Sequence, residues 1–254
     1  MIISVINQTR GKIPDEEVQT AIRAINRQIG QDFANYWALG ATLRLEGNPS
    51  IKPTQQTITS MRGDAVMYLW DGNDVPGALS YHHANSAGIP YGFVFTELAR
   101  KLKENWTRML SHEVLEIIGD PQVNLRVQGP HPVHPDHAVF YWYEMCDAVQ
   151  AQSYRIDGIE VSNFVLPPYF TGGEELGGRN DFLGRAHRGK TLRSFGVSPG
   201  GYVGFFNPAT GKNETFANRG DKVAAQRIKL KQAAGETRRT VRHQTFAQAG
   251  IASR

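Results

Sequence analysis

One short segment of the chain combines side chains that can bind a metal ion and transfer a proton: HEVLE, which begins at His112. It lies within residues 109–121, MLSHEVLEIIGDP, a largely apolar stretch that predicts a helix. Because residues four positions apart share one face of a helix, His112 and Glu116 can direct an imidazole nitrogen and a carboxylate oxygen at one cation. Glu113 projects at a different angle, from which it can accept a proton from a water bound to that cation. This is the spacing of the HExxH motif of zinc proteases, with a glutamate in place of the second histidine.

The same three side chains also occur together on ordinary solvated helices, so their setting matters. The residues around them include Val114, Leu115, Ile117 and Ile118, which predicts a buried helix. A buried histidine and two buried carboxylates need hydrogen-bonding partners or a metal ion, because an unpaired charge is costly inside a protein. The segment therefore predicts either a metal site or a hydrogen-bonded polar cluster without metal.

A catalytic zinc ion usually has three protein ligands and one water, so a third ligand must come from another part of the chain. The best candidates are Glu144 and Asp147, which lie among apolar neighbours in the segment YEMCDAV, residues 143–149. The alternative for each is a structural salt bridge or a helix cap. Two carboxylate ligands make a harder site than two histidines and a glutamate. Zinc is the expected ion, and manganese, calcium or iron are compatible with such a site.

The chemistry expected of this arrangement is metal-assisted hydrolysis. A bound cation lowers the pKa of its water and polarises the scissile carbonyl. Glu113 then accepts the water proton and passes it to the leaving amine. An edge strand beside the site can hold an extended peptide by backbone pairing, and the predicted strands at residues 77–83 and 91–95 are both candidates.

Five other histidines are also candidates for a functional site. His131, His134 and His137 recur at every third position of a proline-rich segment. They could form a separate metal site or supply the third ligand, although a flexible loop rarely holds a preformed site. His82 and His83 are neighbours in a predicted strand, so their side chains point to opposite faces and one of them is expected to line the cleft.

Two further residues near the motif each have two interpretations. Cys146 is the single cysteine, which excludes an intramolecular disulfide. Its thiol could be a nucleophile paired with a histidine, but a lone cysteine in an apolar segment is more often an inert core residue. Asp120 could orient His112 by accepting a hydrogen bond, or it could simply end the helix together with Pro121.

Hydrophobic periodicity predicts the elements that position the motif. A strand at residues 2–6 is followed by a helix that begins with acidic residues at 15–17 and runs to about Gly30. A helical stretch containing Leu98 and Trp106 leads into HEVLE, as one helix or as two. Further strands are expected at residues 41–46, 65–70, 77–83 and 91–95, with a loop at 47–64 and a turn at 84–90.

After the predicted active-site helix, the composition of the chain changes. Residues 129–137 are proline-rich and residues 172–189 are glycine-rich, which predicts irregular structure. Residues 201–206 and 214–217 are expected to pair as a hairpin across the turn-rich segment NPATGKN. The order of elements predicts an α+β fold, with a twisted mixed sheet packed on the active-site helix and an irregular C-terminal part.

The charge of the chain is concentrated at its C-terminal end. The 254 residues carry a formal net charge of +4, and residues 221–254 hold eight Lys or Arg against two acidic residues, so the remainder is slightly acidic. We expect a domain at residues 1–220 and a basic tail at 221–254, which is either solvated or in contact with an anionic partner. No apolar run is long enough to predict a membrane span. The N-terminus is typical of a first strand rather than a signal peptide, so the cytoplasm is the default expectation.

The chain resembles a group of zincin-like metallopeptidases found in bacteria and phages. The resemblance extends over roughly residues 1–205 and leaves the basic tail outside. It implies a zincin-like α+β fold in which His112 and Glu116 bind zinc, Glu113 is the general base, and Glu144 or Asp147 completes the site. The segments that carry the resemblance are SHEVLEIIGDP at 111–121, YEMCDAV at 143–149 and VSNFVLPPYF at 161–170, together with INQTRGKIPDEEVQTAIRAINRQI and PGALSYHHANSAGIPYGFVF.

Three functions are compatible with these observations. The first is zinc-dependent hydrolysis of a peptide or amide bond, with a peptide or protein as substrate. The second is a zincin fold without catalytic activity that serves as a structural or partner-binding protein, such as a virion component. The third is nucleic-acid binding through the basic tail, which would depend strongly on salt.

Overall fold

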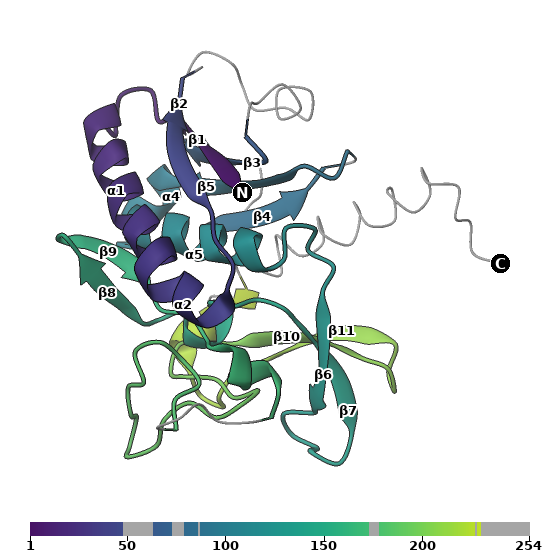
Figure 1. The fold of residues 1–254 in the computed structure, drawn as a ribbon. Helices are drawn as coiled ribbons and strands as arrows, with labels where there is room; N and C mark the ends of the chain where they lie inside the picture. The colour runs from purple at the N-terminus through teal and green to yellow at the C-terminus, as the bar shows by residue number, and fades with distance from the viewer. Residues whose placement is uncertain (48–62, 73–78, 86, 173–177, 227, 230–254) are drawn as a thin grey trace.

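A five-stranded mixed sheet forms one half of the fold, in the strand order β2-β1-β3-β5-β4 (Figure 1). Four strands run parallel, and β4 pairs antiparallel with β5 at one edge, so the predicted mixed sheet is confirmed. Since β5 lies between β3 and β4, the prediction that residues 91–95 could offer an edge to a peptide is wrong. The strands are β1 (Ile2–Gln8), β2 (Thr42–Glu46), β3 (Ala65–Trp70), β4 (Ser80–Ala84) and β5 (Pro90–Phe95).

The computed structural model describes residues 1–47, 63–72, 79–85, 87–172, 178–226 and 228–229. Four predicted segments lie partly outside the described residues: most of the loop at 47–64, the start of the strand at 77–83, part of segment 172–189 and most of the basic tail at 221–254. Within the described part of the chain, no helix combines the length and the apolar character needed to cross a membrane.

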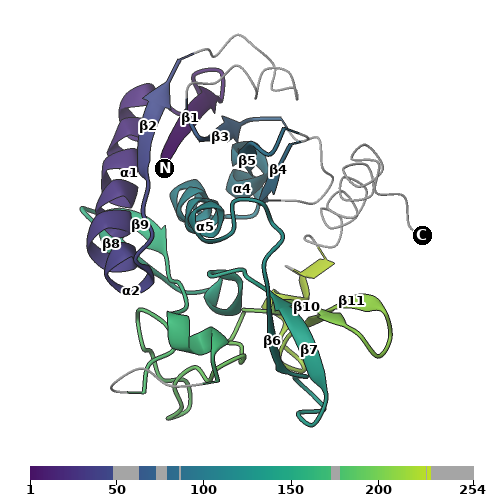
Figure 2. The same ribbon diagram turned by 45° about the vertical axis from the view of Figure 1, so that its right-hand side comes forward.

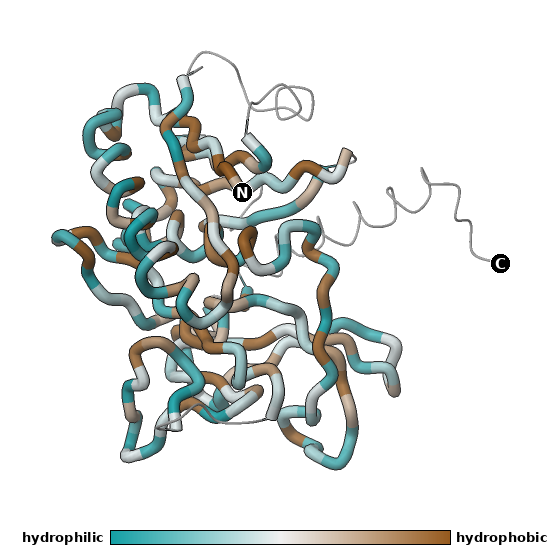
Figure 3. The backbone as a smooth tube through the Cα atoms, in the orientation of Figure 1, coloured by the Kyte–Doolittle hydropathy of each residue, from teal (hydrophilic) through white to brown (hydrophobic). Residues whose placement is uncertain are grey.

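The alternation of side chains along the strands makes the two faces of the sheet different. One face packs against α1 (Asp15–Arg27) and α5 (Trp106–Gly119), and it is largely aliphatic, with residues such as Met67 fully buried. The other face is aromatic, with the rings of Tyr68 and Phe93 stacked 5.0 Å apart. In Figure 3 the inner strands of this sheet are rich in apolar residues, whereas the edge strand β4 and much of α1 are hydrophilic. Figure 2 shows α5 between the sheet and the second half of the fold.

The first helix continues beyond the residue at which the sequence predicts its end. It passes Gly30 through a π-helical turn, η1 (Gln28–Phe33), and then enters α2 (Ala34–Trp37). The backbone leaves the helix at Ala38, which adopts the left-handed conformation with φ 53°. The predicted end is wrong because burial of side chains such as Phe33 outweighs the cost of about 1 kcal/mol for a glycine inside a helix.

The C-terminal half has more regular structure than the sequence predicts. A four-stranded antiparallel sheet has the order β11-β10-β7-β6, and a separate hairpin pairs β8 with β9. The hairpin predicted across NPATGKN is confirmed as β10–β11. Segment 129–137, predicted to be irregular, begins in the edge strand β6, where Pro130 is tolerated because an edge strand has one unpaired side. The elements are β6 (Arg126–Pro130), β7 (Ala138–Trp142), η2 (Asp147–Val149), β8 (Ser153–Ile156), β9 (Ile159–Ser162), η3 (Pro167–Phe170), β10 (Val203–Asn207) and β11 (Lys212–Phe216).

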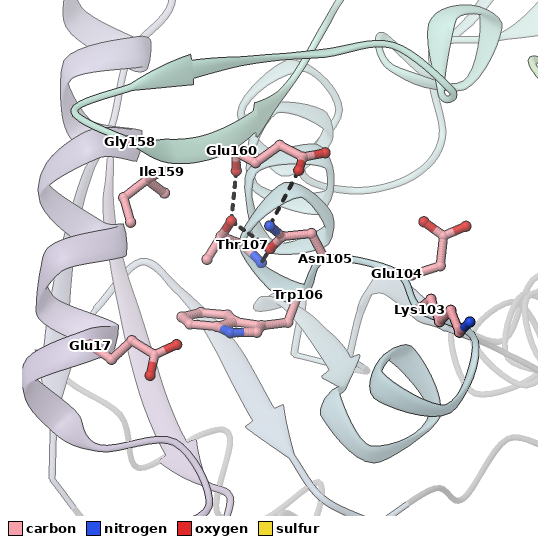
Figure 4. A pocket seen from close by; sticks show the side chains of 9 residues that line it. All are labelled: Glu17, Lys103, Glu104, Asn105, Trp106, Thr107, Gly158, Ile159 and Glu160. Atoms are coloured by element: carbon pink, nitrogen blue, oxygen red, sulfur yellow. Dashed lines mark hydrogen bonds between the residues drawn. The ribbon is translucent and has the colours of Figure 1, made fainter.

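Two helices, rather than one, lead into and contain the HEVLE segment: α4 (Thr96–Lys101) and α5. At the start of α5, the side chain of Asn105 accepts a hydrogen bond of 2.9 Å from the backbone N–H of Thr107 and so caps the helix. The Thr107 hydroxyl donates to the backbone oxygen of Glu160 at 2.7 Å, which ties this end of the helix to β9. These residues line a hollow of about 510 Å³ (Figure 4).

A buried polar network fixes α5 one residue before the motif. The Ser111 hydroxyl donates to the side-chain oxygen of Gln28 at 2.6 Å and accepts from the backbone N–H of Ser162 at 3.0 Å. Gln28 in turn donates to the backbone oxygen of Ser162 at 2.7 Å. All three residues have no exposed surface. Since Gln28 is the first residue of η1, the π-helical turn, α5 and β9 are held in one arrangement.

Replacing Gln28 with Ala is expected to lower the free energy of unfolding by about 1–3 kcal/mol, because Ser111 and Ser162 would lose hydrogen-bonding partners in the interior. Urea unfolding followed by circular dichroism measures the change. The matched control is Gln31→Ala, an exposed glutamine of the same turn, for which a change of less than about 0.5 kcal/mol is expected. Equal losses in the two variants would contradict a specific role for the network.

Candidate metal centre

Helix α5 directs three titratable side chains into the protein interior. His112, Glu113 and Glu116 are 6%, 4% and 1% exposed, respectively. His112 and Glu116 lie on one face of the helix, as their spacing predicts, and His112 Nε2 is 3.3 Å from Glu116 Oε1. Glu113 points to another side, toward the sheet edge.

Strand β4 contacts both carboxylate oxygens of Glu113. The Ser80 hydroxyl donates to Oε1 at 2.7 Å, and His82 Nδ1 lies 2.8 Å from Oε2. The next residue, His83, points to the opposite face and stacks on Tyr91, with ring centroids 6.0 Å apart. The prediction that the two histidines face opposite sides is confirmed, and His82 is the one that meets α5.

Both carboxylates that the sequence leaves as alternatives reach the motif. Asp147 Oδ1 lies 3.4 Å from His112 Nε2. Glu144 approaches the other histidine, since its Oε2 lies 4.0 Å from His82 Nε2. Asp147 is directed at His112, and Glu144 is directed at His82. The two acidic residues are therefore not alternatives for one and the same position.

The backbone of segment 143–149 is held closely against α5 and the loop before β10. The N–H of Cys146 lies 3.3 Å from Glu116 Oε1, to which it donates. Gly201 packs directly on this segment, where a Cβ atom would lie 2.2 Å from the backbone oxygen of Ala148 and 3.1 Å from that of Asp147. Only a glycine fits this contact without moving the backbone that carries the acidic residue.

Within the described residues, two groups of three side chains place donor atoms all within 4.8 Å of one another. Glu116 belongs to both groups. Asp147 belongs to neither, although it approaches His112. The first group is His112, Glu116 and Cys146, and the second is His82, Glu116 and Glu144.

The acidic and imidazole groups shift one another's pKa. Burial lowers the pKa of His112, but the carboxylates of Glu116 and Asp147 more than offset this effect and raise it well above its ordinary value. Burial and neighbouring acidic groups raise the pKa of Glu116 to about 7, although His112 opposes the change. For Glu113, burial raises the pKa, but the hydrogen bond with His82 and the charge of His112 lower it below its ordinary value. The carboxylates therefore hold protons on the imidazoles, and a metal ion that bound His112 would have to displace the proton of its ring.

Asp120 ends helix α5 rather than orienting His112. Its carboxylate accepts hydrogen bonds from the backbone N–H groups of Asn124 at 3.1 Å and Leu125 at 2.9 Å. These bonds stabilise the turn that follows α5. Of the two predicted interpretations, the structure therefore supports the helix stop, and the role of an acceptor for His112 is wrong.

The three loop histidines lie together at the turn between β6 and β7. The rings of His131 and His134 are 5.1 Å apart, and those of His134 and His137 are 5.9 Å apart. His131 Nε2 lies 4.0 Å from Glu214 Oε2 on β11. None of the three belongs to either donor group found among the described residues, so the prediction that one of them supplies the third ligand beside His112 and Glu116 is wrong, and the three do not form a donor group of their own.

Cys146 is completely buried, and burial raises the pKa of its thiol well above the ordinary value. A thiol in this state is a poor nucleophile, in agreement with a core position. Its sulfur nevertheless belongs to the first donor group, and a metal ion deprotonates a thiol that coordinates it. The sequence does not predict Cys146 as a ligand, or Ser80 and His82 as partners of Glu113. The available signals were the place of Cys146 beside Asp147 and the alternation of Ser80 and His82 along one strand.

The hollow at the start of α5 shares no residue with either donor group (Figure 4). The candidate centre is therefore defined by the convergence of donor atoms and not by that hollow. Comparison of the chain with protein-family models, with curated proteins and with solved structures found no match.

Proposed function

We propose that this protein is a zinc-dependent metallopeptidase of zincin-like fold that hydrolyses a peptide or amide bond. The observation that carries the proposal is the convergence of His112, Glu116 and Cys146 within 4.8 Å, with Asp147 3.4 Å from His112. A general base, Glu113, sits beside these donors on the same helix. The packing of α5 against a mixed sheet supports the zincin-like architecture.

The chemistry of the donors fits a divalent transition metal. Zinc binds nitrogen, carboxylate oxygen and thiolate at about 2.0–2.3 Å, usually in a tetrahedral arrangement, so two of its ligands lie about 3.3 Å apart. The 3.3 Å between His112 Nε2 and Glu116 Oε1 matches that separation. When bound, such an ion lowers the pKa of a coordinated water and polarises the carbonyl of the substrate.

Glu113 is the residue that moves the proton. Its pKa is held below the ordinary value, so it is ionised near neutral pH and can accept a proton from a water. Ser80 and His82 each contact one of its oxygens and so orient the carboxylate from β4. When Glu113 passes its proton to the leaving amine, it returns to the ionised state.

Strand β4 is the part of the chain suited to hold the substrate. Backbone hydrogen bonds join Leu79 with Phe95 and Asn85 with Ile89 at the two ends of the β4–β5 pair. Because bonded pairs alternate in an antiparallel ladder, the backbone groups of His82 point away from β5. An extended peptide that paired with this edge would pass directly beside the general base, but His82 is only 1% exposed, so such pairing requires that the groups covering the strand move aside.

The low exposure of the centre favours a second candidate function. All of the side chains in the two donor groups are at most 9% exposed, as expected of a centre that stabilises the fold rather than one that admits a substrate. In that case the protein is a zincin-like structural or partner-binding protein. Its metal, or its polar cluster, would serve to hold α5, β4 and segment 143–149 together.

The test is hydrolysis by the full chain after chelation and after addition of zinc. We expect cleavage of a mixed-peptide library, read by mass spectrometry, only in the zinc-loaded protein, with one or more zinc ions retained through gel filtration. Stoichiometric zinc without cleavage would support the structural alternative. The absence of both zinc and cleavage would reject the metallopeptidase.

A further inference from the structure

The two carboxylate oxygens of Glu116 face two different histidines. Oε1 lies 3.3 Å from His112 Nε2, whereas Oε2 lies 3.5 Å from His82 Nδ1. A carboxylate in this position does not belong to one donor group alone. It can bridge two cations, with one oxygen bound to each; because His82 Nδ1 contacts Glu113, the second cation would bind His82 through Nε2.

The second donor group has the features of a metal site in its own right. Glu144 Oε2 lies 4.0 Å from His82 Nε2, and both belong with Glu116 to a group whose donor atoms are within 4.8 Å of one another. His82 Nδ1 lies 2.8 Å from Glu113 Oε2. A histidine that binds a metal through one ring nitrogen almost always donates from the other to a carboxylate or a backbone oxygen, and Glu113 meets this requirement for His82.

The negative charge of the buried carboxylates also favours a second cation. Four carboxylates, those of Glu113, Glu116, Glu144 and Asp147, are at most 9% exposed around this centre. One divalent cation offsets half of the formal charge of these four groups. With the Cys146 thiolate as a ligand of the first ion, the cluster carries five negative charges, of which two divalent cations offset four. Because uncompensated charge is costly in the interior, a second cation stabilises the arrangement when all four groups are ionised.

We propose that the centre holds two divalent cations bridged by Glu116, the first beside His112 and Cys146 and the second beside His82 and Glu144. The proposal rests on the proposed metal-dependent function and deepens it. Two ions held by one bridging carboxylate can together stabilise the attacking and the leaving atoms of a hydrolytic reaction. The second position also explains why a histidine of the sheet edge is buried among carboxylates rather than exposed.

The experiment counts bound ions in the full chain. Protein stripped with chelator is titrated with Mn²⁺, passed through gel filtration and assayed for manganese by mass spectrometry. We expect two equivalents in the wild type and one in each of the variants His82→Ala and Glu144→Gln. The matched control, His134→Ala, removes an exposed histidine of the β6–β7 turn and should retain two.

A second measurement needs no substitution. Two manganese ions that share a carboxylate are coupled, so the electron paramagnetic resonance spectrum of the wild type should change from isolated-ion lines at one equivalent to a coupled spectrum at two. One equivalent that is unchanged in His82→Ala, with isolated-ion lines throughout, would overturn the second site and leave the proposed function standing. No bound manganese or zinc in the wild type would overturn both.

Discussion

Replacing Glu113 with Gln is expected to lower the rate of peptide hydrolysis by about 10²–10⁴-fold, the range that a positioned general base contributes. The amide has the shape of the carboxylate and can still accept the hydrogen bond from Ser80, but it cannot take a proton from water. The ion beside His112 should remain bound, because Glu113 belongs to neither of the two donor groups. The affinity for an ion beside His82 should fall, because the amide cannot accept hydrogen bonds from both Ser80 and His82. The measurements are kcat on a cleavable peptide and metal content by mass spectrometry.

The control for this variant is Glu97→Gln, a half-buried position of α4 that pairs with Arg100 and lies outside both donor groups, which should leave both kcat and metal content unchanged. A Glu113→Gln protein that keeps its full activity would remove the general base from the proposal. A protein that loses its metal as well as its activity would show that Glu113 is a ligand, and the mechanism would have to assign the proton transfer to another group.

Replacing His112 with Ala is expected to abolish the stabilisation that metal gives to the folded protein. At a metal concentration one hundred times Kd, a ligand that binds only the native state contributes about 2.7 kcal/mol. For a chain of this size that corresponds to a rise in Tm of about 5–11 °C. The wild type should show this rise on addition of zinc and lose it with chelator, whereas the variant should show a much smaller change.

His134→Ala is again the appropriate control, since it removes an imidazole that lies outside the donor groups. Its response to zinc should match that of the wild type. If His112→Ala kept the full rise in Tm, zinc would be bound elsewhere, and the first donor group would not be the principal site. Differential scanning calorimetry with and without zinc provides the comparison.

Some elements followed from local pattern alone. The apolar run of β3 and the continuous burial of α5 are visible in the sequence because periodicity and turn residues act over a few positions. The hairpin of β8 and β9 escaped prediction although its signal was present. Asp157 and Gly158, with φ 50° and 83°, form a two-residue turn of the kind that Asp-Gly favours.

The π-helical turn could not have been predicted in the same way. The residues of η1 continue the apolar spacing of α1. Gly30 is therefore the local feature that predicts the end of the helix. What keeps the chain helical is a contact with distant segments, since Gln28 bonds with Ser111 and Ser162. A pattern read over a dozen residues contains no information about such partners.

In the candidate centre, too, some contacts follow from the local sequence and others depend on the tertiary structure. The spacing of His112 and Glu116 on one helix determined by itself that these two groups would lie side by side, because helix geometry sets distances between residues four apart. Only the tertiary structure decided which distant groups meet them. The position of β4 at the sheet edge brings His82 to Glu113, and the return of the chain after β7 brings Cys146 to Glu116. Those distances depend on how sheet and helix pack over the whole domain, and the local sequence does not determine that packing.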